Sequence, residues 1–191
     1  LYQEKLKRMR ALVKLYQAGH IDLLFGDEVG FSLKPYIPYG WQPIGIQRSI
    51  PSARTHVLNV FGLMSIDNRL RFYPSKDNID SLFIIQCLDD FANKIVTEKL
   101  LPTVIIWDNA SWHKSQAVMS KRNEWEQKGL HLFFQPTYSP HLNKAETLWR
   151  KVKYEWLKPQ NYKSASTLKK AVIRILSLFG SDYNINFSMN Y

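Results

Sequence analysis

The sequence predicts an α/β protein built on a mixed five-stranded sheet that is flanked by helices. Its 191 residues, of which 45% are hydrophobic, suffice for one domain that removes roughly 70% of its unfolded surface from water. Two strand-like runs separated by a short turn form a hairpin early in the chain, and the second half alternates buried strands with amphipathic helices. These observations exclude an all-helical bundle and a plain doubly wound sheet.

The first hundred residues contain the patterns of two helices and three strands. The opening helix has apolar side chains at helical spacing and stops at a glycine, whereas the strands are short apolar runs bounded by polar turns. In chain order the expected elements are a basic helix over 1–19, a strand over 21–25, a hairpin of strands over 56–65 and 69–73, and a helix that begins at Asp77 or Asn78 and ends near Lys99.

The second half alternates strands and helices. A glycine closes the first of these helices, because glycine readily adopts the left-handed conformation that follows a helix end. The expected elements are a strand over 103–107, a helix over 114–128 before Gly129, a strand over 130–134, a helix from Asn143 to about Leu157, and a last helix over 168–179. This order matches the ribonuclease H-like architecture, and we therefore expect a linker helix over 1–19 and a ribonuclease H-like domain over 20–191.

Composition excludes several classes of protein. Charged and polar residues interrupt every apolar run well before the roughly 20 residues that a membrane span needs, so we expect no membrane partner. The first ten residues lack the apolar core of a signal peptide. A single cysteine, Cys87, cannot form an internal disulfide or a thiolate metal cluster, which favours a reducing, intracellular setting.

Two basic segments account for the formal net charge of +10. Residues 1–14 carry a net charge of +4 and residues 144–174 a net charge of +7, so the rest of the chain is nearly neutral. Clustered positive charge suggests a polyanion as partner, and DNA or RNA is the commonest one. The alternative is that these lysines and arginines form solvated helix faces.

Three acidic residues follow the expected strands at positions that would bring them to one edge of the sheet. Asp27 follows the first strand, Asp108 follows the fourth, and Glu146 lies in the first turn of the helix after the fifth. If the first and fourth strands are parallel neighbours, both aspartates emerge at the same carboxyl edge, where open α/β sheets place their sites. Converging carboxylates repel one another unless a cation lies among them, and magnesium prefers such oxygen ligands.

Each acid also has a structural interpretation. Asp27 could be an ordinary strand-end carboxylate, and Asp108 could form a turn or a helix cap. Asn143 and Glu146 have the spacing of a capping box, in which the glutamate returns to the amide of the capping residue. Two Mg²⁺ or Mn²⁺ ions bound by all three acids would instead hold the attacking and leaving oxygens of a phosphodiester in line.

Three blocks of sequence around these acids resemble the acidic motifs of the IS630 family of transposases, which is related to the Tc1/mariner elements. They are Gly26-Asp27-Glu28, Trp107-Asp108-Asn109-Ala110-Ser111-Trp112-His113 and Pro136-Thr137-Tyr138-Ser139-Pro140-His141-Leu142-Asn143-Lys144-Ala145-Glu146-Thr147-Leu148-Trp149. The third block is the most specific, and Tyr39-Gly40-Trp41 with Pro43 is also similar to the segment that follows the first acid in this family.

This resemblance implies a DDE superfamily endonuclease domain over 20–191, with Asp27, Asp108 and Glu146 as the metal-binding triad. Thirty-seven residues separate the last two acids, which is close to the family spacing. The implied activity is metal-dependent hydrolysis at transposon ends, followed by attack of the freed 3′-hydroxyl on target DNA. Such a protein would work at the nucleoid of a prokaryote or in the nucleus of a eukaryote. It could act as a homodimer.

Two departures from the family pattern bear on these expectations. Lys144 and Ala145 stand where the family commonly has Pro and Ile, immediately before the third acid. The helix-turn-helix module with which the family binds transposon ends is not among these 191 residues, so we expect little sequence preference from them. The alternatives are a ribonuclease H or junction nuclease on the same fold, and a catalytically silent DNA-binding remnant.

Five further residues are candidates for contact with DNA. Arg150 and Lys153 lie four and seven residues after Glu146 on one helix face and could hold phosphates, although a solvated surface is the alternative. Lys144 adjoins the same acid. His113 could activate water or lie beside the site, but capping or contact with Asn109 is the simpler role. Trp41 could stack on a base or pack its own loop.

Overall fold

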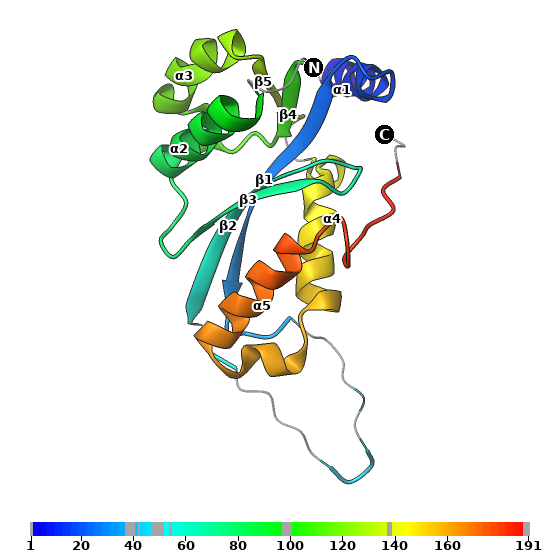
Figure 1. Cartoon of the computed structure of the whole chain (residues 1–191), viewed down its shortest axis with the longest axis vertical. Coiled ribbons are helices and arrows are strands. Elements are labelled where there is room, and N and C mark those ends of the chain that lie inside the picture. Colours follow the sequence, from blue (N-terminus) through cyan, green and yellow to red (C-terminus); the bar gives the residue numbers. More distant parts are fainter. Residues whose placement is uncertain are drawn as a thin grey trace.

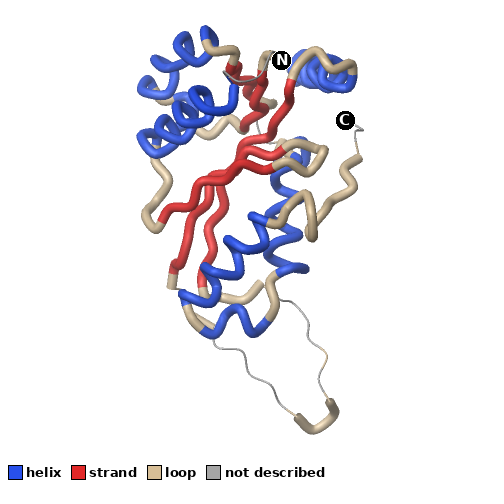
Figure 2. The backbone as a smooth tube through the Cα atoms, viewed as in Figure 1, coloured by secondary structure: helices blue, strands red, loops and turns tan. Residues whose placement is uncertain are grey.

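The computed structural model describes residues 2–36, 41, 43–46, 52–53, 55–96, 101–136 and 139–188. Figure 1 shows a twisted sheet with helices on both faces, and Figure 2 shows the strands running together through the middle of the molecule. The expected order of elements is confirmed. Tyr39, Tyr138 and the expected helix end near Lys99 lie outside the described residues.

Five strands form a single mixed sheet in the order β3-β2-β1-β4-β5. β1 pairs antiparallel with β2 and parallel with β4, β4 pairs parallel with β5, and the hairpin partner β3 lies at the edge. The strand bounds are β1 Asp22–Ser32, β2 His56–Met64, β3 Leu70–Ser75, β4 Thr103–Trp107 and β5 Leu130–Phe134. The predicted parallel pairing of the first and fourth strands is therefore confirmed.

The expected end of the first strand at residue 25 is wrong. β1 continues to Ser32 because its antiparallel pairing with β2 extends that far, whereas its parallel pairing with β4 ends at Phe25 and Ile106. Asp27 therefore lies inside β1, two residues beyond the point where β1 and β4 separate.

Alternating side chains of the strands feed two hydrophobic clusters, one on each face of the sheet. Leu23, Phe25, Val29 and Phe31 of β1 pack with the helices α1, α4 and α5, whereas Leu24 packs with α2 and α3. The helix bounds are α1 Tyr2–Gln17, α2 Ser81–Phe91, α3 Gln116–Gln127, α4 Lys144–Lys151 and α5 Ala165–Ser177. Both basic segments thus belong to the same face, because α1, α4 and α5 carry them.

Helix boundaries follow local hydrogen bonding. The expected cap of α2 at Asp77 or Asn78 is wrong, because Asp80 accepts the hydrogen bond from the amide of Phe83 at 2.8 Å. Ser115 caps α3, which therefore begins at Gln116, two residues later than expected, and a 3-10 turn over Ser111–Lys114 precedes it. α2 and α4 each continue into a π-helical turn, over Ala92–Val96 and Val152–Trp156. In the part of the chain that the structure describes, no helix is long and apolar enough to span a membrane.

Candidate active site

Asp27 is the most deeply placed of the three predicted acids. It is 9% exposed, and one of its carboxylate oxygens accepts a hydrogen bond from the amide of Glu28 at 3.0 Å. Burial, followed by the nearby charges of Glu146 and Glu28, raises the pKa of Asp27 well above its ordinary value. A buried carboxylate surrounded by other carboxylates is costly to ionise, and a bound cation would offset that cost.

Asp108 follows directly after β4 and lies on the loop that leads to the 3-10 turn. Its carboxylate accepts a hydrogen bond from the amide of Ala110 at 2.9 Å and lies 2.5 Å from the ring of His113. Partial burial raises the pKa of Asp108, but these contacts with His113 and Ala110 outweigh it and hold the pKa below its ordinary value. Asp108 is therefore ionised at neutral pH, whereas ionisation of Asp27 is penalised.

Glu146 lies in the first turn of α4, and Asn143 fixes where that helix begins. The side chain of Asn143 accepts a hydrogen bond from the amide of Ala145 at 3.1 Å and donates one to the carbonyl of Gly26 at 3.0 Å. One buried amide therefore caps α4 and ties it to β1 next to Asp27. The Asn143 side chain thus accepts from the amide of Ala145, whereas the amide of Glu146 donates to the carbonyl of Asn143, which differs from the capping box that was the alternative interpretation. The side chain of Glu146 is exposed.

A glycine on β2 lets α4 approach the sheet closely. Gly62 is the register partner of Asp27, and the indole of Trp149 lies over it. A Cβ atom at Gly62 would lie 2.7 Å from the ring carbon Cη2 of Trp149, which is well inside van der Waals contact. Because Trp149 lies three residues after Glu146, this close approach brings the third acid toward Asp27.

His113 is fully buried at the junction of two acids. Its Nδ1 atom faces Asp108, and its Nε2 atom lies 3.2 Å from a carboxylate oxygen of Glu28. Burial lowers the pKa of His113, but the contacts with Asp108 and Glu28 outweigh it and raise that pKa to about 9. The ring is thus a buried cation between two carboxylates, and this position replaces the predicted contact with DNA.

Lys153 projects from the π-helical turn toward the same acids. Its side chain is partly buried, and its ammonium lies 4.6 Å from the ring centre of Tyr36 and 5.6 Å from that of Phe31. Burial lowers the pKa of Lys153, while the charges of Glu146 and Asp27 oppose that change. This lysine is therefore a cation held beside the acidic site by aromatic rings.

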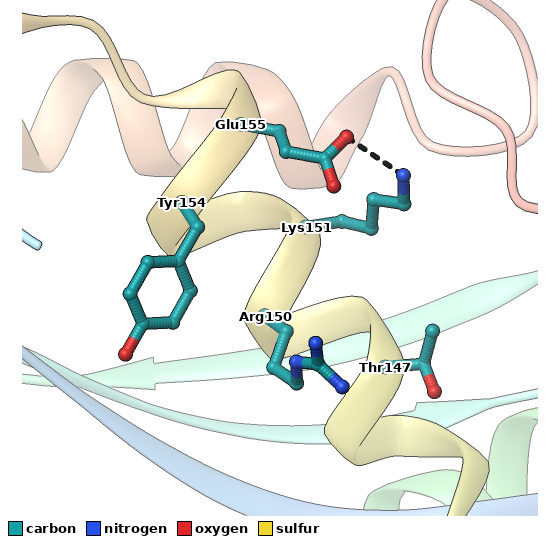
Figure 3. A pocket seen from close by; sticks show the side chains of 5 residues that line it. All are labelled: Thr147, Arg150, Lys151, Tyr154 and Glu155. Carbon is teal, nitrogen blue, oxygen red and sulfur yellow. Dashed lines mark hydrogen bonds and ion pairs between the residues drawn. The ribbon is translucent and has the colours of Figure 1, made fainter. Parts of the chain in front are cut away.

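Arg150 lies on the outer side of α4 in a hollow of about 550 Å³, which Figure 3 shows. Five side chains line it, and the ammonium of Lys151 pairs with the carboxylate of Glu155 at 2.7 Å. The lining residues are Thr147, Arg150, Lys151, Tyr154 and Glu155. Arg150 is exposed.

Two other predicted DNA contacts have contrasting surroundings. Lys144 is partly buried, and burial lowers the pKa of its ammonium. Trp41 is fully exposed, and it belongs to a stretch in which only isolated residues are described. Exposure of a large aromatic ring is compatible with stacking on a base.

The three acids approach one another without forming a closed ligand set. Within the described residues, no group of three His, Cys, Asp or Glu side chains is close enough to hold a metal ion. The charges of Glu146 and Asp108 nevertheless both act on Asp27. The donor set consists of carboxylate oxygens, which suits Mg²⁺ or Mn²⁺. The raised pKa of Asp27 reflects its burial first and then repulsion by the neighbouring carboxylates, which a bound cation would offset.

Sequence reasoning did not identify three residues that build this site. Asn143 was expected only to cap a helix, Gly62 was not singled out, and Glu28 was a neighbour of the first acid without a role. The alternation of side chains along β1 could have separated Glu28 from Asp27, because adjacent residues face opposite sides of a sheet. The contact between Glu28 and His113 joins residues 85 positions apart and has no local signal.

The parallel pair β1 and β4, with Asp27 and Asp108 just beyond the end of their ladder and Glu146 in the first turn of α4, has the arrangement of a ribonuclease H-like fold. A family model described as DDE superfamily endonuclease matches residues 22–169. The chain belongs to this family. No curated protein sequence matches it.

Solved structures with the same fold include complexes of the mariner transposase Mos1. The Mos1 paired-end complex with Mg has a TM-score of 0.63 and 16% identity, covering 95% of this chain and 55% of the Mos1 chain. The paired-end complex with Mn has a TM-score of 0.57, 16% identity and coverages of 93% and 56%. The Mos1 strand transfer complex has a TM-score of 0.56, 15% identity and coverages of 94% and 57%. This chain therefore spans a little over half of the Mos1 chain in each of these three complexes.

Proposed function

We propose that this chain is the catalytic domain of a DNA transposase, which breaks and rejoins phosphodiester bonds with the help of divalent metal ions. The observation that carries the proposal is the position of the buried Asp27 just beyond the β1–β4 ladder, where Asn143 ties the start of the Glu146 helix to Gly26. Burial, followed by the charges of Glu146 and Glu28, raises the pKa of Asp27. Asp27, Asp108 and Glu146 would hold the ions. Bound metal ions would supply a nucleophile at neutral pH and stabilise charge on the leaving oxygen.

The protein's own residues would hold the reacting strand. Lys153 is positioned to contact a phosphate oxygen beside Asp27 and Glu146, and Arg150 and Lys144 extend positive charge along α4. The basic segments on α1, α4 and α5 lie on the sheet face that carries Asp27, so they would attract the DNA backbone toward the site. We expect binding of this kind to have little sequence preference.

The finer assignment to the IS630 group rests on the sequence block around Glu146. The Ser139-Pro140-His141-Leu142-Asn143 segment supports it, and Asn143 has a structural reason to be there because it joins α4 to Gly26. Solved paired-end and strand transfer complexes of Mos1 support transposon ends as substrate and a dimer as the working unit. Such a protein acts where the DNA is, in a nucleoid or a nucleus.

Nicking of supercoiled plasmid DNA tests this function without knowledge of the transposon ends. We expect the wild-type chain to nick the plasmid in Mg²⁺ or Mn²⁺ and the Asp108→Asn variant to fall to background. Asp67→Asn is the matched control, because its carboxylate pairs with Arg69 near the opposite end of the β1–β4 ladder. Preferential cleavage of an RNA–DNA hybrid would favour a ribonuclease H, and nicking by Asp108→Asn at the wild-type rate would refute the assignment.

A further inference from the structure

The backbone does not fix the distance between the first two acids. The parallel ladder of β1 and β4 ends with the pair Phe25 and Ile106, and beyond it β1 follows β2. Asp27 stays on β1, whereas Asp108 enters an irregular loop. Since metal ligands must be held to within a fraction of an ångström, a further contact has to join these two segments.

Glu28 and His113 make that contact. Glu28 follows Asp27 on β1, and its carboxylate oxygen lies 3.2 Å from Nε2 of His113, whose Nδ1 lies 2.5 Å from Asp108. One imidazole therefore spans from the strand of the first acid to the carboxylate of the second.

The bridging ring is rigidly held. His113 is 0% exposed and stacks on Trp107, with ring centres 3.9 Å apart and an interplanar angle of 27°. Trp107 is itself fully buried and is the last residue of β4. Ring stacking therefore sets the height of His113 above the strand end, and Glu28 is the partner that fixes the rotation of the ring.

Glu28 lies on the other face of β1 from Asp27. Successive side chains of a strand point to opposite faces, and Asp27 faces the cluster that contains α4. Glu28 faces the 3-10 turn that carries His113, and its side chain is 18% exposed. It is thus turned away from Glu146 and poorly placed to share a metal ion with that residue.

We infer that Glu28 is a positioning residue, which acts through the ring of His113 to hold Asp108 at the distance from Asp27 that metal binding requires. This inference rests on the proposed function, since it assumes that Asp27 and Asp108 are ligands of the same ions. A group that hydrogen-bonds to a metal-ligating carboxylate usually contributes to metal affinity although it does not touch the metal, and Glu28 fixes the orientation of such a group.

The experiment measures binding of Mn²⁺ to the full chain without DNA, by calorimetric titration well below the unfolding midpoint of each variant. Groups that hydrogen-bond directly to a metal ligand typically contribute about 10–100-fold to affinity; since Glu28 acts one contact further away, we expect Glu28→Ala to weaken the affinity by about 10-fold. Glu28→Gln should bind within a few-fold of wild type, because an amide can still hydrogen-bond to the ring. Glu155→Ala removes a carboxylate from the π-helical turn after α4 and is the matched control, with unchanged affinity expected.

A double variant tests whether Glu28 acts through the ring. If it does, Glu28→Ala combined with His113→Asn should bind Mn²⁺ no more weakly than His113→Asn alone, because both changes break the same bridge. Additive losses would overturn the inference. Wild-type affinity in Glu28→Ala would overturn it as well, and so would equal losses in Glu28→Gln and Glu28→Ala, because they would show that the charge of Glu28 itself matters.

Failure of the underlying function has a different signature. If Asp108→Asn bound Mn²⁺ as tightly as wild type, the proposed metal site would be wrong and this inference would fall with it. If Asp108→Asn lost binding while Glu28→Ala kept it, only the role of Glu28 would be wrong.

Discussion

The close packing of α4 on β2 predicts that a single methyl group at Gly62 disturbs both the fold and the site. In a Gly62→Ala variant, the new Cβ atom would lie 2.7 Å and 2.8 Å from two ring carbons of Trp149. Carbon atoms in contact normally lie about 3.5–4.0 Å apart, so the indole has to move by about 1 Å. The ring is rigid and 3% exposed, and it therefore transmits this shift to its helix.

The cost of such overpacking is about 1–3 kcal/mol. For a domain of this size, that loss corresponds to a decrease of about 2–12 °C in the unfolding midpoint. Urea and thermal unfolding of the metal-free chain measure it directly. We also expect weaker binding of Mn²⁺, because a displaced α4 carries Glu146 away from Asp27.

Two further variants test whether the contact between Gly62 and Trp149 sets the position of α4. Gly30→Ala is the control on the neighbouring strand, where the added methyl meets the side-chain oxygen of Asn59 at 3.1 Å, and that side chain can move aside. In the double variant Gly62→Ala/Trp149→Leu, the smaller leucine side chain leaves room for the added methyl group. The double variant should therefore recover part of the lost stability, with a coupling energy of about 0.5–3 kcal/mol. Equal stability of Gly62→Ala and wild type, or strict additivity in the double variant, would show that this contact does not set the position of α4.

Three other predictions concern the charges and the tie between β1 and α4. The pKa of Asp27 is raised above 3.8, so ionisation of this carboxyl removes stability from the metal-free chain as pH rises through the folded-state pKa. At neutral pH without metal, Asp27→Asn should therefore unfold at a higher temperature than wild type. A lower unfolding midpoint would contradict this. Asn143→Ala should lower the free energy of unfolding in urea by about 1–3 kcal/mol, because it removes the cap of α4 and the side-chain donor to the Gly26 carbonyl. An unchanged midpoint would argue against both roles. Affinity for duplex DNA should fall steeply with salt, with a log–log slope of about −0.9 per phosphate contacted, and a flat titration would exclude the basic face as the binding surface.

The elements of this fold are visible in the sequence because each has a local cause. Apolar runs such as 103–107 and 130–134 became strands with the expected bounds, and Gly129 has the positive φ of 84° that a helix end favours. The end of β1 was wrong because it depends on pairing with β2, whose residues stand 24 or more positions further along the chain. The cap of α2 was wrong because several acidic and amide side chains compete over residues 77–80.

The candidate site was partly predictable for the same reason. The positions of Asp27, Asp108 and Glu146 follow from strand order and motif, and the structure brings their charges together around Asp27. The hydrogen bond from Asn143 to Gly26 and the burial of His113 depend on how distant segments pack together. The sequence near each residue therefore carries no signal for them. Neither the periodicity of a helix nor that of a strand specifies which side chain from another element completes a hydrogen bond.

Location of bound metal is the most direct test of the central claim that Asp27, Asp108 and Glu146 form one site for divalent ions. Anomalous scattering from a crystal of the chain soaked in Mn²⁺ would locate the ions independently of any activity. The account predicts Mn²⁺ between the carboxylates of Asp27 and Asp108, with Glu146 turned toward it and Glu28 still on His113. Mn²⁺ bound elsewhere, or bound by Glu28 in place of Asp108, would contradict it.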